Sequence, residues 1–225
     1  MIYIRAGVYA EGPTDYDFLL PLLDRLLDSL AASLFPGAYE VGSTEGIDAP
    51  RGASGGRAEK IASAIDVSWG ACTLFVIHAD GAGDPAAARR NCVEPGVEAA
   101  RAKYAERHLA VAACIPMREI EAWMLADPEA FRTILGESSV PACPADPERE
   151  IDPKATLRRI LKEGGVRRPP ERIYAFFGER VRLEALRSLP AFRAFERDLV
   201  AALHALAGAP QHDTKQVKQE KRERR

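Results

Sequence analysis

Four short apolar runs lie in the first half of the chain, and each is followed by a stretch whose apolar residues recur at helical spacing. The runs cover residues 2–10, 38–42, 72–80 and 108–116. The third is almost entirely apolar from Cys72 to Ile77, as expected for a central parallel strand that is covered on both faces. The pattern therefore predicts four buried β-strands.

Helices are predicted between these strands. The first has a wide apolar stripe, with Thr14 as N-cap and Asp17 as its capping-box partner, and it ends before Pro36. Further helices are expected over residues 57–69 and 93–107. Because strands and helices alternate, we expect an α/β fold with a right-handed, doubly wound parallel sheet.

After Pro116 the pattern changes to helices without strands. These helices are predicted over residues 117–126, 128–135, 153–162 and 191–207. A chain of 225 residues can bury one substantial core. We therefore expect an α/β core over residues 1–127 and a C-terminal helical appendage over residues 128–209 that packs on it. Residues 210–225 are highly charged and lack an apolar run, so we expect them to be disordered.

Charge and cysteine content narrow the class of protein. With a net charge of −2 and a pI near 6.1, the chain has no global field that attracts nucleic acid, so any such contact must use local basic patches. The four cysteines lack metal-ligand spacing, and we expect them to be reduced. The N-terminus lacks the features of a signal peptide, and no apolar run is long enough to cross a membrane. The sequence thus predicts a cytoplasmic protein with no membrane contact.

Acidic residues lie at the ends of the predicted strands and at the start of a helix. Glu11 follows the first strand, Asp80 and Asp84 follow the third, and Glu121 lies in the helix after the fourth. Ligands of open α/β sheets bind outside the carboxyl ends of the strands, so Glu11 and Asp80 should lie close together. Carboxylate oxygens suit Mg²⁺ or Mn²⁺. We therefore predict a divalent metal site with these four carboxylates as ligands.

Two of the four acids also have a purely structural interpretation. Glu11 lies near a predicted helix N-terminus, where an anion is favourable. Asp84 can cap the next helix, with Pro85 at its first position. The sequence leaves both alternatives open.

Three side chains near the predicted site differ in their expected surroundings. His78 lies two residues before Asp80, and its side chain faces the same way along the strand. The sequence leaves open whether it is a metal ligand, a proton carrier or a core histidine. Glu121 lies on a largely apolar helix face, where an unpaired carboxylate is unfavourable. A metal, an arginine partner or a raised pKa would each relieve that cost. Glu119 points elsewhere and is expected to be a solvated acid.

Basic residues near these loops are candidate phosphate contacts. Arg57 follows a glycine-rich loop that lacks the spacing of a Walker A motif. Lys154 follows an Asp-Pro pair that is typical of a helix start. Arg158 and Arg159 belong to a basic stretch that runs to Arg168. This stretch has the charge of a nucleic-acid footprint, although a solvated surface is the default interpretation. These four residues are the predicted substrate-binding set.

The chain resembles the Toprim-like family of unknown function that includes the effector nuclease of the PARIS anti-phage system, and which is related to the overcoming-lysogenization-defect nucleases. The resemblance spans most of residues 2–206. It depends on the order and spacing of five markers: VYAEGPTDYDFL, VIHADGAGD, PMREIEAWMLAD, DPK and SLPAFRAFERDL.

The resemblance implies roles for individual residues. Glu11 matches the catalytic glutamate after the first Toprim strand, and Asp80 matches the second aspartate of the DxD motif. His78 replaces the first aspartate of that motif. Asp84 is then expected to restore the missing charge, and Glu121 to complete the site. Glu11, Asp80 and His78 form the expected catalytic set.

The resemblance implies a divalent-metal-dependent nuclease that hydrolyses phosphodiester bonds in RNA or DNA during bacterial phage defence. It also implies a separate ATPase partner, and it leaves a homodimer open. The alternative is a catalytically silent Toprim-fold subunit that binds or scaffolds a defence complex. A third alternative is a phosphatase or nucleotidyl-transfer enzyme that acts on small phosphates.

Overall fold

The computed structural model describes residues 1–104, 108–136, 142–166 and 170–208. The charged tail that the sequence predicts to be disordered lies outside these residues, as do Arg167 and Arg168. Within the described residues, no helix has the length and apolar composition needed to cross a membrane.

The centre of the molecule is an all-parallel β-sheet, which confirms the expected α/β class. Strands β4 (Glu45–Gly46), β2 (Ala6–Tyr9), β5 (Leu74–His78) and β6 (Val111–Cys114) lie side by side in that order. Strands β1 (Ile2–Ile4) and β3 (Tyr39–Val41) form a second parallel pair. The first predicted strand is therefore divided at Arg5, whose backbone N–H donates to Thr73 Oγ1 at 2.9 Å.

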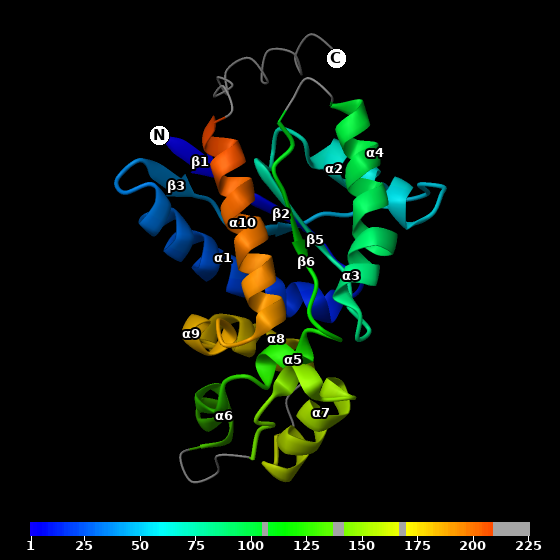
Figure 1. Ribbon diagram of the computed structural model, residues 1–225. Helices are drawn as coiled ribbons and strands as arrows, with labels where there is room; N and C mark the ends of the chain where they lie inside the picture. The colour runs from blue at the N-terminus through cyan, green and yellow to red at the C-terminus, as the bar shows by residue number, and fades with distance from the viewer. Residues whose placement is uncertain (105–107, 137–141, 167–169, 209–225) are drawn as a thin grey trace.

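Helices cover both faces of the sheet, as a doubly wound fold requires (Figure 1). One face carries α2 (Arg57–Ser68) and α4 (Glu94–Lys103), and the other carries α1 (Pro13–Leu34), α8 (Pro170–Arg180) and α10 (Pro190–Gly208). Alternate residues of β5 face the two layers: Leu74 and Val76 belong to the core with α1, while Phe75 and Ile77 belong to the core with α2. Both faces of the central strand are therefore buried.

The start of α1 differs from the sequence prediction. Gly12 is the N-cap and Pro13 the first helical residue, so Thr14 lies inside the helix. The capping-box partner is Asp15, whose Oδ2 accepts a hydrogen bond from the Gly12 N–H at 2.9 Å. Proline suits the first helical position because its missing N–H would have no intrahelical partner there.

The remaining helices follow the prediction in part. The helix expected over 93–107 starts earlier, as α3 (Pro85–Ala88) and the π-helical turn η1 (Arg89–Val93), and continues into α4; residues 105–107 lie outside the described residues. The later elements are α5 (Glu121–Met124), α6 (Pro128–Leu135), the 3₁₀ turn η2 (Pro147–Arg149), α7 (Pro153–Glu163) and α9 (Leu183–Leu186). The sequence prediction missed α8 and α9.

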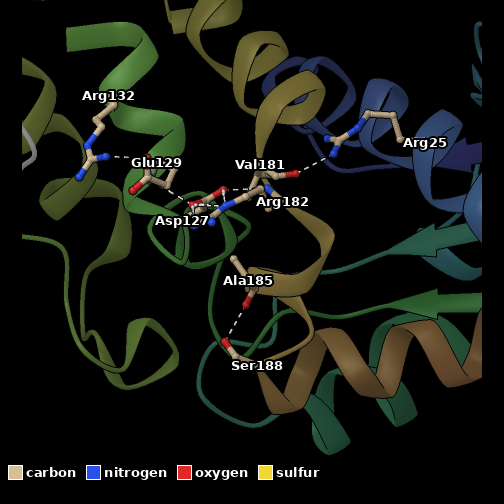
Figure 2. A network of polar contacts seen from close by, with 8 residues as sticks. All are labelled: Arg25, Asp127, Glu129, Arg132, Val181, Arg182, Ala185 and Ser188. Carbon is tan, nitrogen blue, oxygen red and sulfur yellow. Dashed lines mark hydrogen bonds and ion pairs between the residues drawn. The ribbon is translucent and has the colours of Figure 1, made fainter. Parts of the chain in front are cut away.

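An ion pair between a buried aspartate and a partly exposed arginine connects α6 to the turn between α8 and α9 (Figure 2). Asp127 is fully buried and caps α6 through the Glu129 N–H, while its oxygens accept three side-chain hydrogen bonds and one backbone hydrogen bond from Arg182. Arg25 of α1 donates to the Val181 carbonyl at 2.9 Å. Polar contacts therefore connect α1, α6 and the α8–α9 turn.

Candidate active site

Glu11 and Asp80 follow neighbouring parallel strands. Tyr9 of β2 pairs with Ile77 of β5. Glu11 lies two residues after Tyr9 and Asp80 three residues after Ile77, so both lie at the same edge of the sheet. Each side chain is 41% exposed. The carboxyl edge of the sheet thus presents two accessible carboxylates from adjacent strands.

Arg57 holds Glu11 in place from the first turn of α2. Its Nη1 lies 2.8 Å from Glu11 Oε1, its Nη2 donates to the His78 carbonyl at 2.6 Å, and its Nε donates to the Cys92 carbonyl at 2.9 Å. The guanidinium also lies over the Tyr9 ring, 5.6 Å from its centroid. Although the sequence predicts Arg57 as a substrate contact, these interactions engage its guanidinium with protein groups and fix the Glu11 carboxylate.

His78 is fully buried beneath the two carboxylates of Asp80 and Asp15. Its Nδ1 lies 3.0 Å from the Cys114 carbonyl, and its Nε2 lies 3.5 Å from Asp80 Oδ1 and 3.8 Å from Asp15 Oδ2. Burial alone lowers the pKa of His78, but the interactions with Asp80, Cys114 and Asp15 outweigh it and raise the pKa well above 6.5. The buried ring thus faces two carboxylates, neither of which lies within hydrogen-bond distance of Nε2 in the described residues.

The loop after β5 packs closely against the segment after β6. A Cβ at Gly81 would lie 2.2 Å from the Pro116 carbonyl oxygen, and the Gly83 N–H donates to the Met117 carbonyl at 2.8 Å. Asp84 is exposed and caps α3, accepting a hydrogen bond from the Ala87 N–H at 2.9 Å. Its geometry is that of the structural alternative, because its carboxylate is used at the helix start.

Glu121 is 2% exposed and has its own protein partners. The Tyr174 hydroxyl donates to Glu121 Oε1 at 2.5 Å, and Lys154 Nζ lies 3.3 Å from the same oxygen. Burial lowers the pKa of Lys154, but the charges of Glu121 and Glu119 outweigh it and raise the pKa. Tyr174 and Lys154 are therefore the partners of the buried Glu121 carboxylate.

Glu119 is not the solvated acid that the sequence suggests. Its Oε2 is buried and accepts no hydrogen bond within the described residues. Burial raises the pKa of Glu119, as do the charges of Glu121 and Asp80, while Lys154 opposes the shift. Glu119 therefore couples electrostatically to both Asp80 and the Glu121–Lys154 pair.

The predicted basic footprint lies only partly within the described residues. Arg158 and Arg159 are both exposed on α7, and Arg159 Nη1 lies 3.3 Å from Glu163. The charge of Arg158 acts on Lys154 and Tyr174, so Arg158 is near the Glu121 cluster. Two cations of α7, Lys154 and Arg158, thus lie beside the buried acids.

Sequence reasoning missed Asp15 and Tyr174. Asp15 faces His78, and its signal was available: an acid at the third helical position after a proline is typical of a capping box. Tyr174 reaches Glu121 from 53 residues further along the chain, and no local pattern indicates that contact.

The four predicted metal ligands do not form one cluster. Within the part of the chain that the structure describes, no three His, Cys, Asp or Glu side chains are grouped in a way that could hold a metal ion. Asp84 caps a helix and Glu121 accepts a hydrogen bond from Tyr174, so each of these two carboxylates has a protein partner. Glu11 and Asp80 remain, and two exposed carboxylates fit Mg²⁺ or Mn²⁺, because Mg²⁺ usually takes one or two carboxylates together with water and substrate phosphates.

Comparison with known families gave one match. The profile of a domain of unknown function, DUF4276, matches residues 10–200. No curated protein and no solved structure matches the chain.

Proposed function

The chain belongs to the DUF4276 family, and on that premise we propose that it is a Toprim-type, divalent-metal-dependent nuclease that hydrolyses phosphodiester bonds in RNA or DNA. The observation that carries the proposal is the pair of exposed carboxylates, Glu11 and Asp80, at the ends of adjacent parallel strands. The all-parallel sheet with helices on both faces supports the Toprim-like interpretation.

Glu11 and Asp80 would hold the cation, Mg²⁺ or Mn²⁺. When bound, it supplies positive charge that neutralises the oxygens of the scissile phosphate. Arg57 Nη1 lies 2.8 Å from Glu11 Oε1, and the Glu11 side chain is 41% exposed, so the carboxylate is held in place and accessible to a ligand. Side chains that are already held in position, as Glu11 is by Arg57, stabilise charge that develops in the transition state without having to move during the reaction.

His78 acts here as a positioning residue. It is fully buried and therefore cannot touch a substrate, but its ring faces Asp80 from below. Its Nδ1 contact with the Cys114 carbonyl fixes the orientation of the ring. His78 thus holds Asp80 toward the open edge of the sheet.

The biological setting that we propose is phage defence with a separate ATPase partner that restrains or triggers the nuclease. The support is the resemblance of the five sequence markers. Copurification with an ATPase encoded beside this chain would test the partner.

The second candidate is a catalytically silent Toprim-fold subunit. The observation that favours it is the fully buried His78, whose Nε2 lies 3.5 Å from Asp80 Oδ1, where the Toprim motif has a carboxylate. The pKa of His78 is raised, and positive charge on the ring would oppose a metal cation at Asp80. Metal binding separates the two candidates, since a ligand that binds the folded state raises the melting temperature with its concentration. The silent subunit predicts no shift with Mg²⁺ or Mn²⁺.

The main test is cleavage of labelled total RNA and of plasmid DNA with Mg²⁺ or Mn²⁺. We expect Glu11→Gln and Asp80→Asn each to lower kcat by more than about 100-fold. Changing a group that only supports a metal ligand costs up to about 100-fold, and the loss of a ligand itself should cost more. Both variants remove charge at nearly constant volume, so thermal melting should show that they remain folded.

The chain offers matched controls. Glu45 pairs with Arg5 at 2.7 Å and is 36% exposed, and Asp66 pairs with Lys103 at 2.6 Å and is 37% exposed. We expect Glu45→Gln and Asp66→Asn to retain wild-type cleavage. Equal activity in Glu11→Gln and Glu45→Gln would reject the site, and a third outcome, hydrolysis of small phosphate esters alone, would favour the small-phosphate enzyme.

A further inference from the structure

A hollow of about 420 Å³ opens beside the loop that carries Asp80. Its walls come from three segments that are distant in sequence: the loop after β5 at Gly83, the segment after β6 at Met117 and Arg118, and the region from η2 to the start of α10. The Gly83 N–H to Met117 carbonyl bond holds the first two walls together. The hollow thus adjoins the loop that carries Asp80, which is bonded to the segment after β6.

Arg118 presents its guanidinium to this hollow. The Cζ, Nη1 and Nη2 atoms all lie 3.7 Å from the position that a Gly83 Cβ would take, so the flat face of the guanidinium lies over Gly83. The side chain is partly buried, and within the described residues it makes no hydrogen bond or ion pair. Its side-chain N–H groups therefore have no partner in the part of the chain that the structure describes.

The acids of the hollow, by contrast, are engaged. Glu148 is buried and accepts a hydrogen bond from the Ala191 N–H at 2.9 Å, at the start of α10. Asp146 Oδ2 lies 3.1 Å from Arg149 Nε. Both acids thus have protein partners, whereas the Arg118 guanidinium has no ion-pair partner among the described residues and can donate to an anion in the hollow. Arginine is the residue that binds phosphate with two parallel N–H donors.

We propose that Arg118 binds a backbone phosphate next to the one that Glu11 and Asp80 act on, and that the substrate is therefore a polynucleotide strand and not a small phosphate ester. This inference rests on the proposed nuclease function. The physical basis is that a small ester has no second phosphate to place in the hollow, whereas a strand has one on either side of the scissile bond.

The test compares Arg118→Ala and Arg118→Lys with wild type. A short single-stranded RNA and the DNA of the same sequence are the strand substrates, and bis(p-nitrophenyl) phosphate is the small one. We expect Arg118→Ala to raise KM for the strand about tenfold, the value of roughly one charge-assisted contact, with kcat unchanged. Hydrolysis of the small ester should not change, and Arg118→Lys should recover only part of the KM.

Binding supplies an independent readout. Without divalent cations, fluorescence anisotropy over a salt series should show that Arg118→Ala lowers the slope of log affinity against log salt by about 0.7, the value for one phosphate contact on a single strand. Arg132→Ala is the matched control, because Arg132 is a partly exposed arginine paired with Glu129 at 3.0 Å. We expect that control to leave both KM and the salt slope unchanged.

The outcomes separate the inference from the proposed function. Unchanged KM and salt slope in Arg118→Ala would overturn the inference while the nuclease stands, and so would an equal loss on the small ester. If wild type binds a strand without cleaving any substrate and Arg118→Ala lowers the salt slope, the nuclease proposal fails and the phosphate site stands. If wild type binds neither strand, the inference is overturned.

Discussion

Gly81 shows how one residue positions the candidate site. It lies where the loop after β5 crosses the segment after β6, and a Cβ there would lie 2.2 Å from the Pro116 carbonyl and 2.6 Å from the Met117 carbonyl. Backbone atoms cannot move away as a flexible side chain can. The absence of a side chain at this residue therefore lets the loop that carries Asp80 pack against the segment after β6.

We expect Gly81→Ala to lower the free energy of unfolding by about 2 kcal/mol or more, because the added methyl overlaps backbone carbonyls. Metal-dependent cleavage should fall as well, since the loop that carries Asp80 must shift. Urea denaturation measures the first effect. Gly208→Ala is the control, because no described residue lies within 4 Å of a Cβ there. A Gly81→Ala protein as stable as that control would contradict this explanation of the loop packing.

The Tyr174 hydroxyl is a second test at this scale. In Tyr174→Phe, Glu121 keeps Lys154 but loses a donor at 2.5 Å, so we expect the free energy of unfolding to fall by about 1–3 kcal/mol. Tyr39→Phe should change stability little, because within the described residues the Tyr39 hydroxyl makes no hydrogen bond. Equal melting temperatures for the two variants would argue against a structural role for the Tyr174–Glu121 bond.

At the scale of the elements, the Asp127–Arg182 pair connects helices that the sequence separates. Asp127 caps α6, while Arg182 begins the segment that leads into α9 (Figure 2). Burial alone raises the pKa of Asp127, but the hydrogen bonds from Arg182 and from the Glu129 N–H, together with the charge of Arg182, lower it below 3.8. The ionised carboxylate therefore stabilises the junction.

We expect Asp127→Ala to lower the free energy of unfolding at neutral pH by about 2–3 kcal/mol, less than a fully buried pair because Arg182 is more than half exposed. The folded pKa lies below the unfolded one, so this contribution is present above about pH 4 and is lost as the pH falls through the folded pKa. The difference between wild type and Asp127→Ala should therefore shrink in acid.

Asp152→Ala is the control for that experiment. Asp152 also caps a helix, accepting a hydrogen bond from the Ala155 N–H at 2.8 Å, but it is exposed and lacks an arginine partner. Its loss should cost about 1 kcal/mol. Chemical denaturation at several pH values measures both variants, and a pH-independent difference for Asp127→Ala would count against the ion pair.

At the scale of the whole molecule, the N-terminal and C-terminal halves share one core. The buried cluster on the α1 face contains strand residues such as Val8 and Val76 together with Phe177 of α8 and Leu199 of α10. Asp198 of α10 also accepts a hydrogen bond from the Ala113 N–H of β6 and pairs with Arg89. The C-terminal helices therefore cover one face of the sheet and part of its edge.

We expect the full chain to unfold in one cooperative transition, with equal calorimetric and van't Hoff enthalpies. A fragment of residues 1–127 should lack a cooperative transition, because without α8 and α10 one sheet face would be exposed to water. Scanning calorimetry measures both. Two separate transitions in the full chain would instead show that the halves fold independently.

The sequence by itself determined the α/β class and the position of Glu11 and Asp80 after strands. The spacing of apolar residues along the chain is a local property, because it reflects which side of a helix or strand each residue faces. That spacing predicted the parallel sheet and most of the helices. The missed helix α8 follows a proline-rich, basic segment, and its apolar residues, such as Phe177, gain their burial from α1, which is far away in sequence.

Only the tertiary structure decided what each candidate side chain does. Asp84 and Glu121 were both candidate metal ligands in the sequence. The sequence does not show whether a carboxylate binds a metal, caps a helix as Asp84 does, or accepts a hydrogen bond from a distant residue as Glu121 does from Tyr174. The same holds for Arg57, which holds Glu11, and for Arg118, which faces a hollow. These roles depend on contacts between residues far apart in sequence, and packing sets those contacts without leaving a local pattern.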